Sequence, residues 1–208
     1  MSDDLDYSRR ELLLRIGAAV SLAATGEPLL TAQDAQQVHQ AVAQQKAAQP
    51  GAYRPKALTS HEYATLERLS GLIIPADGHS PGAVEAGAAA FLDFLCAASD
   101  EMKGIYTGGL AWLDDQARQR YAGRDFISTP PGQQTALLDL IAWSDRAPAE
   151  MAAGVAFFAW ARKMVVDAYY TSPIGIKDLG YVGNSAMSQF SVPQEAIDYA
   201  LKRSPAAE

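Results

Sequence analysis

Apolar residues recur along most of this chain with the spacing of helices, and no segment alternates long enough to predict a strand. The clearest helix start is the capping box at residues 59–62, in which the Thr59 hydroxyl and the Glu62 carboxylate would each satisfy a backbone amide. An apolar stripe continues as far as Ile73, and Pro75 ends the pattern. This periodicity predicts an all-α fold.

Further helix signals follow along the chain. Ser80-Pro81 and Thr129-Pro130-Pro131 each place a proline where a helix begins. The predicted helices are 82–98, about 101–121 with Gly108-Gly109 inside it, one starting at Thr129, about 148–169, and a short one at about 194–201. The helix over 148–169 carries Met151, Val155, Phe158, Ala159, Arg162 and Val166. It is apolar on more than one side around 155–160, so it is predicted to be central.

The chain divides into three parts by composition. Residues 1–26 form a candidate signal segment, and residues 27–57 are polar and Gln-rich, which favours a spacer with a loose helix around 32–48. Residues 58–208, about 150 residues, suit one helical domain with a single core.

The signal segment carries the adjacent arginines Arg9 and Arg10 before a mildly apolar stretch over 12–24. This is the pattern of a bacterial twin-arginine signal, which exports folded proteins to the periplasm. The stretch is too short and too diluted for a membrane span, although an uncleaved signal could tether the chain to the inner membrane. The alternative is an ordinary amphipathic helix with a chance arginine pair.

The segment 169–184 has three glycines, several large apolar side chains and no helical periodicity. It is therefore predicted to be a long non-helical loop. Its apolar side chains, which include Ile174, Leu179, Tyr181 and Val182, must be buried either on the chain's own helices or on a partner.

Charge and cysteine content exclude several classes of function. The net charge of −7 provides no basic stripe for nucleic acid. Cys96 is the single cysteine, so neither an internal disulfide nor a CxxCH haem attachment is available, and its apolar neighbours predict a buried thiol.

Few residues suggest catalysis. The Asp77/His79 pair could bind a metal or act as a base, but it lacks a third group and is interpreted as a solvated loop. Ser172 and Ser185 lack a nucleophile frame, and no Gly-x-Gly-x-x-Gly follows a strand. The remaining candidates are interpreted structurally: His39 in the spacer, His61 in the capping box, Asp114-Asp115 on an exposed helix face, and Trp112, Trp143 and Trp160 in the core. This pattern favours a non-catalytic role.

Two motifs in order resemble the gluconate 2-dehydrogenase subunit 3 family. The first is Leu72-Ile73-Ile74-Pro75-Ala76-Asp77 with Ser80-Pro81-Gly82-Ala83, and the second is Tyr169-Tyr170-Thr171-Ser172-Pro173 with Leu179-Gly180-Tyr181-Val182-Gly183-Asn184. The twin-arginine start also matches, and the resemblance covers about 60–184.

The resemblance implies a small subunit that accompanies an FAD-containing catalytic subunit of the glucose–methanol–choline type, often with a multi-haem cytochrome c. It implies that Arg9 and Arg10 engage the export machinery and that the flavoprotein is exported with this chain. Partner contacts are expected from Tyr170, Ser172, Leu179, Gly180, Tyr181, Gly183 and Asn184. No cofactor is expected in this chain, and the partner's substrate could be gluconate, glucose, fructose or a glycoside. The alternative is an exported or membrane-tethered adaptor without a redox partner.

Overall fold

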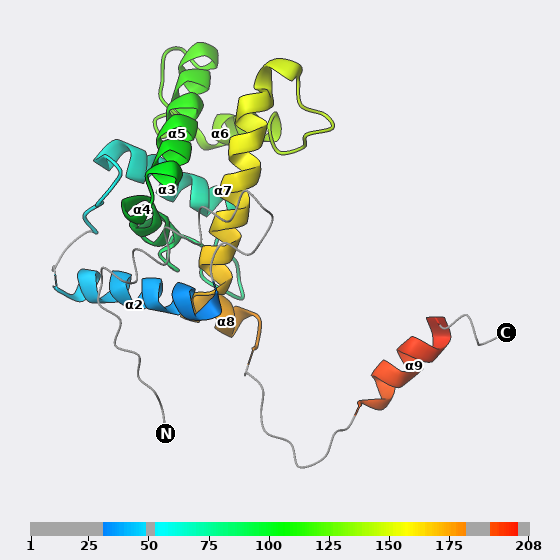
Figure 1. Cartoon of the computed structure of the whole chain (residues 1–208). Helices are drawn as coiled ribbons and strands as arrows, with labels where there is room; N and C mark the ends of the chain where they lie inside the picture. Colours follow the sequence, from blue (N-terminus) through cyan, green and yellow to red (C-terminus); the bar gives the residue numbers. More distant parts are fainter. Residues whose placement is uncertain (1–30, 49–52, 182–191, 204–208) are drawn as a thin grey trace.

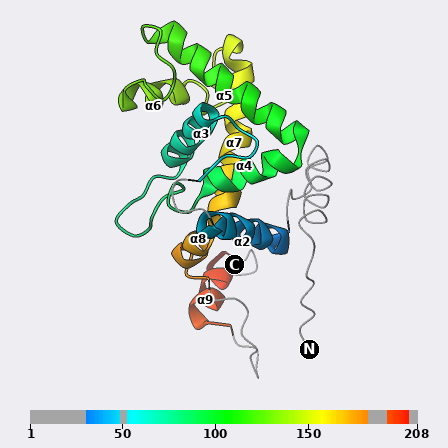
Figure 2. The same ribbon diagram turned by 90° about the vertical axis from the view of Figure 1, so that its left-hand side faces the viewer.

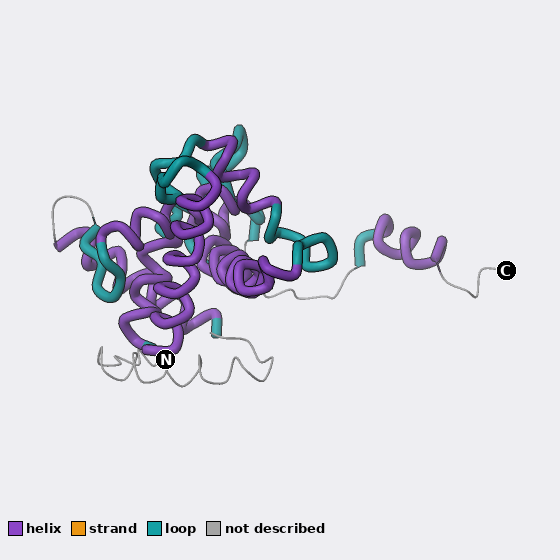
Figure 3. The backbone as a smooth tube through the Cα atoms, turned by 90° about the horizontal axis from the view of Figure 1, so that it is seen from above, coloured by secondary structure: helices purple, strands orange, loops and turns teal. Residues whose placement is uncertain are grey.

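The computed structural model describes residues 31–48, 53–181 and 192–203. All regular structure in these residues is helical, as Figure 3 shows, and the all-α prediction is confirmed. The elements are α2 (Ala32–Ala48), α3 (Ser60–Ile73), α4 (Ala88–Ala98), α5 (Asp100–Arg120), α6 (Pro131–Asp139), the 3₁₀ turn η2 (Ala149–Met151), α7 (Ala152–Tyr170), α8 (Pro173–Asp178) and α9 (Gln194–Arg203). None of the described helices is long and apolar enough to cross a membrane.

Helix α7 is the central element, as predicted. It packs against α3, α4, α5 and α8, and Figure 1 shows it beside the long α5. Two glycines allow this close approach: Gly109 faces the Phe157 ring and Gly154 faces the Trp112 ring, and a Cβ at either position would overlap that ring. Helix α5 runs without a break through the Gly108-Gly109 pair, and Gly109 serves its packing against α7.

The residues noted on α7 do not all lie on its buried side. Ala159, Arg162 and Val166 are exposed, whereas the buried residues are Gly154, Phe157, Phe158, Ala161, Met164, Val165, Ala168 and Tyr169. Apolar side chains occur on more than one side of this helix, so the sequence alone does not separate its buried side from its exposed side.

The helix predicted to start at residue 82 begins at Ala88. Gly87, the residue before it, has a φ of +77°, which interrupts helical backbone. Gly82 lies directly against the backbone of Ile74, Pro75 and Ala76, so the chain is held in turns here. By contrast, the capping box before α3 is present as predicted.

Helix α2 lies within the fold, whereas the sequence favours a spacer. The helix over 32–48 is confirmed, but its thin apolar stripe of Ala35, Val38 and Val42 is buried and packs on α4. Figures 1 and 2 show α2 at one end of α7, next to α8.

The connection from α2 to α3 is held by one carboxylate. Asp93 of α4 is fully buried and accepts hydrogen bonds from the backbone amides of residues 56–58 at 2.7–3.1 Å and from the Tyr53 hydroxyl at 2.9 Å. These four donors satisfy a charge that would otherwise be costly to bury.

Candidate functional site

The predicted partner-binding residues surround the corner between α7 and α8. Tyr170 is the last residue of α7, Ser172 lies between the helices, and Leu179, Gly180 and Tyr181 follow α8. Gly183 and Asn184, as well as Arg9 and Arg10, lie outside the described residues.

The predicted long non-helical loop is wrong for residues 173–178, which form α8. Ser172 is its N-cap: the Ser172 Oγ accepts a hydrogen bond from the Gly175 amide at 3.1 Å and donates one to the Tyr169 carbonyl at 2.6 Å. Pro173 occupies the first helical position. The Ser-Pro pair was the available signal for this helix, and the neighbouring glycine and the lack of periodicity obscured it.

The corner is closely packed inside and apolar outside. Gly175 lies against the Tyr169 carbonyl, where a Cβ would overlap the backbone, and Ser172 is buried. Leu179 and Tyr181 are 61% and 62% exposed, and Tyr170 is 38% exposed. The exposed apolar side chains thus project from a well-anchored turn, while Ser172 acts from within as a cap.

A positive φ at Gly180 turns the chain after α8. Its φ is +62°, and the Gly180 amide donates to the Lys177 carbonyl while the Tyr181 amide donates to the Ile176 carbonyl at 3.2 Å. This is a common αL ending of a helix, and it sets the direction in which the chain continues to Tyr181.

The same corner is joined to the loop at residues 74–83. The Tyr169 hydroxyl donates to the Pro81 carbonyl at 2.9 Å and lies 2.8 Å from the Ser80 hydroxyl. Within the loop, the Asp77 carboxylate accepts from the amides of His79 and Ser80, and these hydrogen bonds lower the pKa of Asp77. The two sequence motifs, nearly ninety residues apart, therefore meet through one buried tyrosine.

A groove of about 550 Å³ runs between α2 and α8. Its walls are mainly apolar, from Val42 and Ala43 on α2 to Ile174 and Ile176 on α8, and polar residues that include Lys46 and Glu85 also line it. His39 also lines it, and this residue was not singled out as functional by the sequence.

His39 connects α2 to the corner. Its Nε2 atom lies 3.0 Å from the Thr171 hydroxyl, and its ring packs on Phe91 with centroids 4.6 Å apart. Burial lowers the pKa of His39 to about 4, so the ring is neutral at ordinary pH.

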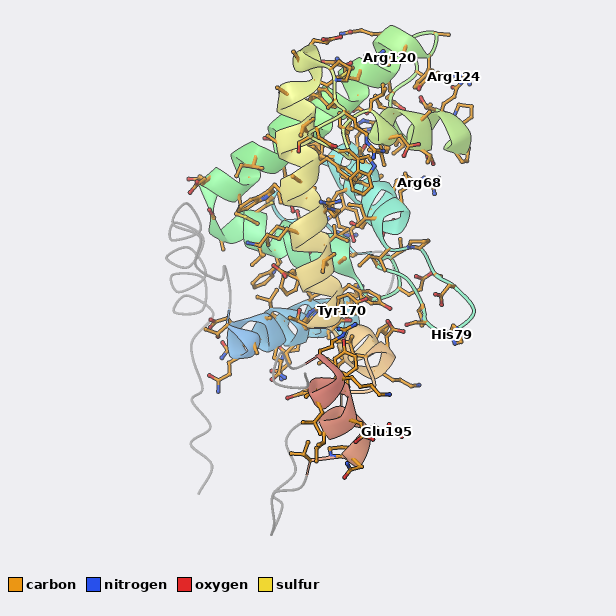
Figure 4. All side chains as sticks on the ribbon, turned by 90° about the vertical axis from the view of Figure 1, so that its right-hand side faces the viewer. Arg68, His79, Arg120, Arg124, Tyr170 and Glu195 are labelled. Atoms are coloured by element: carbon orange, nitrogen blue, oxygen red, sulfur yellow. The ribbon has the colours of Figure 1, made fainter. Side chains whose placement is uncertain are left out.

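The remaining titratable candidates occupy structural positions. His79 is exposed, as the solvated-loop interpretation expects, and Figure 4 shows it on the loop that projects from the helices. Asp114 is buried rather than exposed, and its carboxylate contacts His61 Nε2 at 2.6 Å and the Phe126 amide at 2.9 Å. The described residues contain no group of three or more potential metal ligands.

Two further predictions concern the core. Cys96 is buried as predicted, and burial raises the pKa of its thiol to about 12. Trp112 and Trp160 pack against the core, but Trp143 is 56% exposed, because α6 ends before it and the chain turns there.

Comparison with known proteins gives one match. The family model described as gluconate 2-dehydrogenase subunit 3 matches residues 60–188, which is more than half of the chain and includes both motifs that meet at Tyr169. No curated protein and no solved structure matches the chain.

Proposed function

The chain belongs to the gluconate 2-dehydrogenase subunit 3 family, and we propose that it is the non-catalytic small subunit of a bacterial dehydrogenase complex with an FAD-containing catalytic subunit. In this proposal the small subunit stabilises the flavoprotein and escorts it through twin-arginine export to the periplasm. The flavoprotein oxidises a sugar, a sugar acid or a glycoside, and a multi-haem cytochrome c accepts the electrons.

The observation that carries the proposal is the exposed apolar surface at a rigid corner within the family-matched region. Leu179 and Tyr181 are more than 60% exposed, and both follow a helix that is capped by Ser172 and anchored through Tyr169. Large apolar side chains on a backbone that is already held by hydrogen bonds can bury area on binding without ordering that backbone, which favours a protein interface. We therefore assign Tyr170, Leu179 and Tyr181 to the contact with the flavoprotein.

The first experiment is purification of the tagged chain from its native host in mild detergent, followed by an absorbance spectrum. A complex with a larger second chain and the spectrum of an oxidised flavin is expected. A colourless single chain would contradict the dehydrogenase assignment and would favour an adaptor without a redox partner.

A matched pair of variants tests the surface itself. Leu179→Ala with Tyr181→Ala is expected to reduce the recovered flavoprotein at least about tenfold, because apolar anchors carry most of the energy of an interface. Leu140→Ala with Trp143→Ala is the control, since these side chains are also exposed but belong to the connection that precedes α7, whereas the corner follows it. Equal losses in both variants, or a fall in helical circular dichroism, would remove the corner from the interface.

A further inference from the structure

Two apolar surfaces of the described residues are uncovered in addition to the surface of Leu179 and Tyr181. One is the groove between α2 and α8, and the other is a face of α9. No residue of α9 is buried, and Figures 1 and 3 show this helix apart from the others. A helix of ten residues is marginally stable alone in water, so α9 needs a surface to pack on.

The sequence of α9 is sharply amphipathic. At 100° per residue, Ala196, Ile197, Ala200 and Leu201 fall within one arc, and Asp198, Glu195 and Lys202 lie on the other side of the helix. Ile197 and Leu201 are 37% and 60% exposed. A face of two large and two small apolar residues is the shape that fits into a groove between helices.

The groove is within reach of α9. One of its walls is α8, and the Tyr181 amide at the end of that helix donates to the Ile176 carbonyl in the wall. Twelve residues separate Tyr181 from Gln194, and an extended segment of that length spans up to about 40 Å. Helix α9 is only about 15 Å long, so the connection lets it lie along the groove.

The chemistry of the two surfaces also matches. The groove presents Val42, Ala43, Ile174 and Ile176 between α2 and α8, and Lys46 and Glu85 also line it. Helix α9 carries Glu195 in its first turn and Lys202 and Arg203 in its last turn. The apolar side of α9 can therefore fill the groove while Glu195 and Lys202, on its other side, stay in contact with water.

We propose that α9 folds back and binds in the groove between α2 and α8 of its own chain. The groove is thus filled by a segment of the same molecule, and α9 covers the apolar wall of α8 until it is displaced. The proposal concerns the isolated chain and does not depend on the flavoprotein assigned above.

Disulfide trapping tests the docked position. The variant pairs Ala43→Cys with Ala200→Cys, one on the α2 wall and one on the apolar face of α9, both at exposed sites. The control variant combines Ala43→Cys with Asp198→Cys. Asp198 lies on the opposite face of α9 from Ala200, and the same residues 182–193 connect both to the rest of the chain. The native thiol does not interfere, because Cys96 is buried and its pKa is raised to about 12.

The purified full-length variants are incubated in a glutathione redox buffer, then denatured, and their free thiols are counted by mass after alkylation. If α9 docks, the Ala200 variant should close its intramolecular disulfide at least about tenfold faster than the Asp198 control. Without docking, the shared connection would give the introduced cysteine of either variant the same effective concentration at the α2 wall, and the two rates would be equal. Equal rates would overturn the proposal. Disulfide-linked dimers as the fast product would also overturn it, because they would assign the groove to α9 of a second copy.

Discussion

At the scale of single residues, Tyr169 links the two parts of the chain that carry the family motifs. Its buried hydroxyl donates to the Pro81 carbonyl and lies within hydrogen-bond distance of Ser80, and its own carbonyl accepts from Ser172. Tyrosine at this position therefore fixes the loop at 74–83 against the start of α8.

We expect Tyr169→Phe to lower the free energy of unfolding by about 0.5–1.5 kcal/mol, because the part-buried hydrogen bond to the Pro81 carbonyl is lost. Urea denaturation measures the change. Tyr181→Phe is the control and should change little, since Tyr181 is 62% exposed. Similar values for the two variants would show that the Tyr169 hydroxyl does not hold the loop.

His39 makes stability depend on pH. Its pKa is about 4 in the folded chain and 6.5 as an unperturbed side chain, so between these values the unfolded chain binds the additional proton. The contribution of His39 to the free energy of unfolding is fully present above about pH 6.5 and is lost as the pH falls toward 4. We expect a loss of about 1 kcal/mol, because the partly exposed ring is screened by solvent.

The measurement is urea denaturation from pH 4.5 to 7.5 for the unmodified chain and for His39→Gln. The difference in the free energy of unfolding between the unmodified chain and His39→Gln should become smaller as the pH falls. A difference that is independent of pH would mean that His39 titrates normally.

At the scale of helices, the α5–α7 contact depends on one of two adjacent glycines. Gly109 faces the Phe157 ring with no room for a Cβ, whereas nothing lies within 4 Å of the Cβ position at Gly108. We expect Gly109→Ala to destabilise the fold by about 1–3 kcal/mol through overpacking. Gly108→Ala should stabilise it by about 0.5–1 kcal/mol by reducing the freedom of the unfolded chain. Thermal unfolding distinguishes these opposite signs, and a shift in the same direction for both would contradict the packing.

The starts of helices were predicted correctly where a signal in the neighbouring sequence was enough to fix them. The capping box before α3 and the prolines before α6 act through neighbouring backbone, so they can be recognised without the fold. Ser80-Pro81 and Ser172-Pro173 show the limit of this approach. Both pairs carry the same start signal, but only the second begins a helix, because Gly82 is held against the distant backbone of residues 74–76.

The candidate site was predictable only in part for the same reason. The exposed positions of Leu179 and Tyr181 agree with a surface segment, and the motif order indicated where to look. The contacts of Tyr169 with Pro81 and of His39 with Thr171 join residues 88 and 132 positions apart, and no periodicity in one sequence encodes such pairs. The burial of Asp114 was missed because its partner His61 lies on another helix.

At the scale of the whole molecule, the proposed function combines an export signal at one end with a binding surface near the other. We expect Arg9→Lys with Arg10→Lys to leave both this chain and its flavoprotein in the cytoplasm, because the machinery reads the arginine pair and the partner travels with it. Cell fractionation with antibodies to each subunit measures this. Export of the flavoprotein without this chain would contradict the escort role, while the complex itself could still form.

The buried carboxylates of Asp93 and Asp114 have a consequence for the behaviour of the loops. They accept hydrogen bonds from the amides of Lys56, Ala57 and Leu58 and from the amide of Phe126, all outside the helices. Amide protons held by buried charges exchange with solvent only when the surrounding structure opens. In deuterium oxide these four loop positions should therefore retain their protons as long as the helical interior does, so that the most persistent amides of this protein include some that belong to no helix.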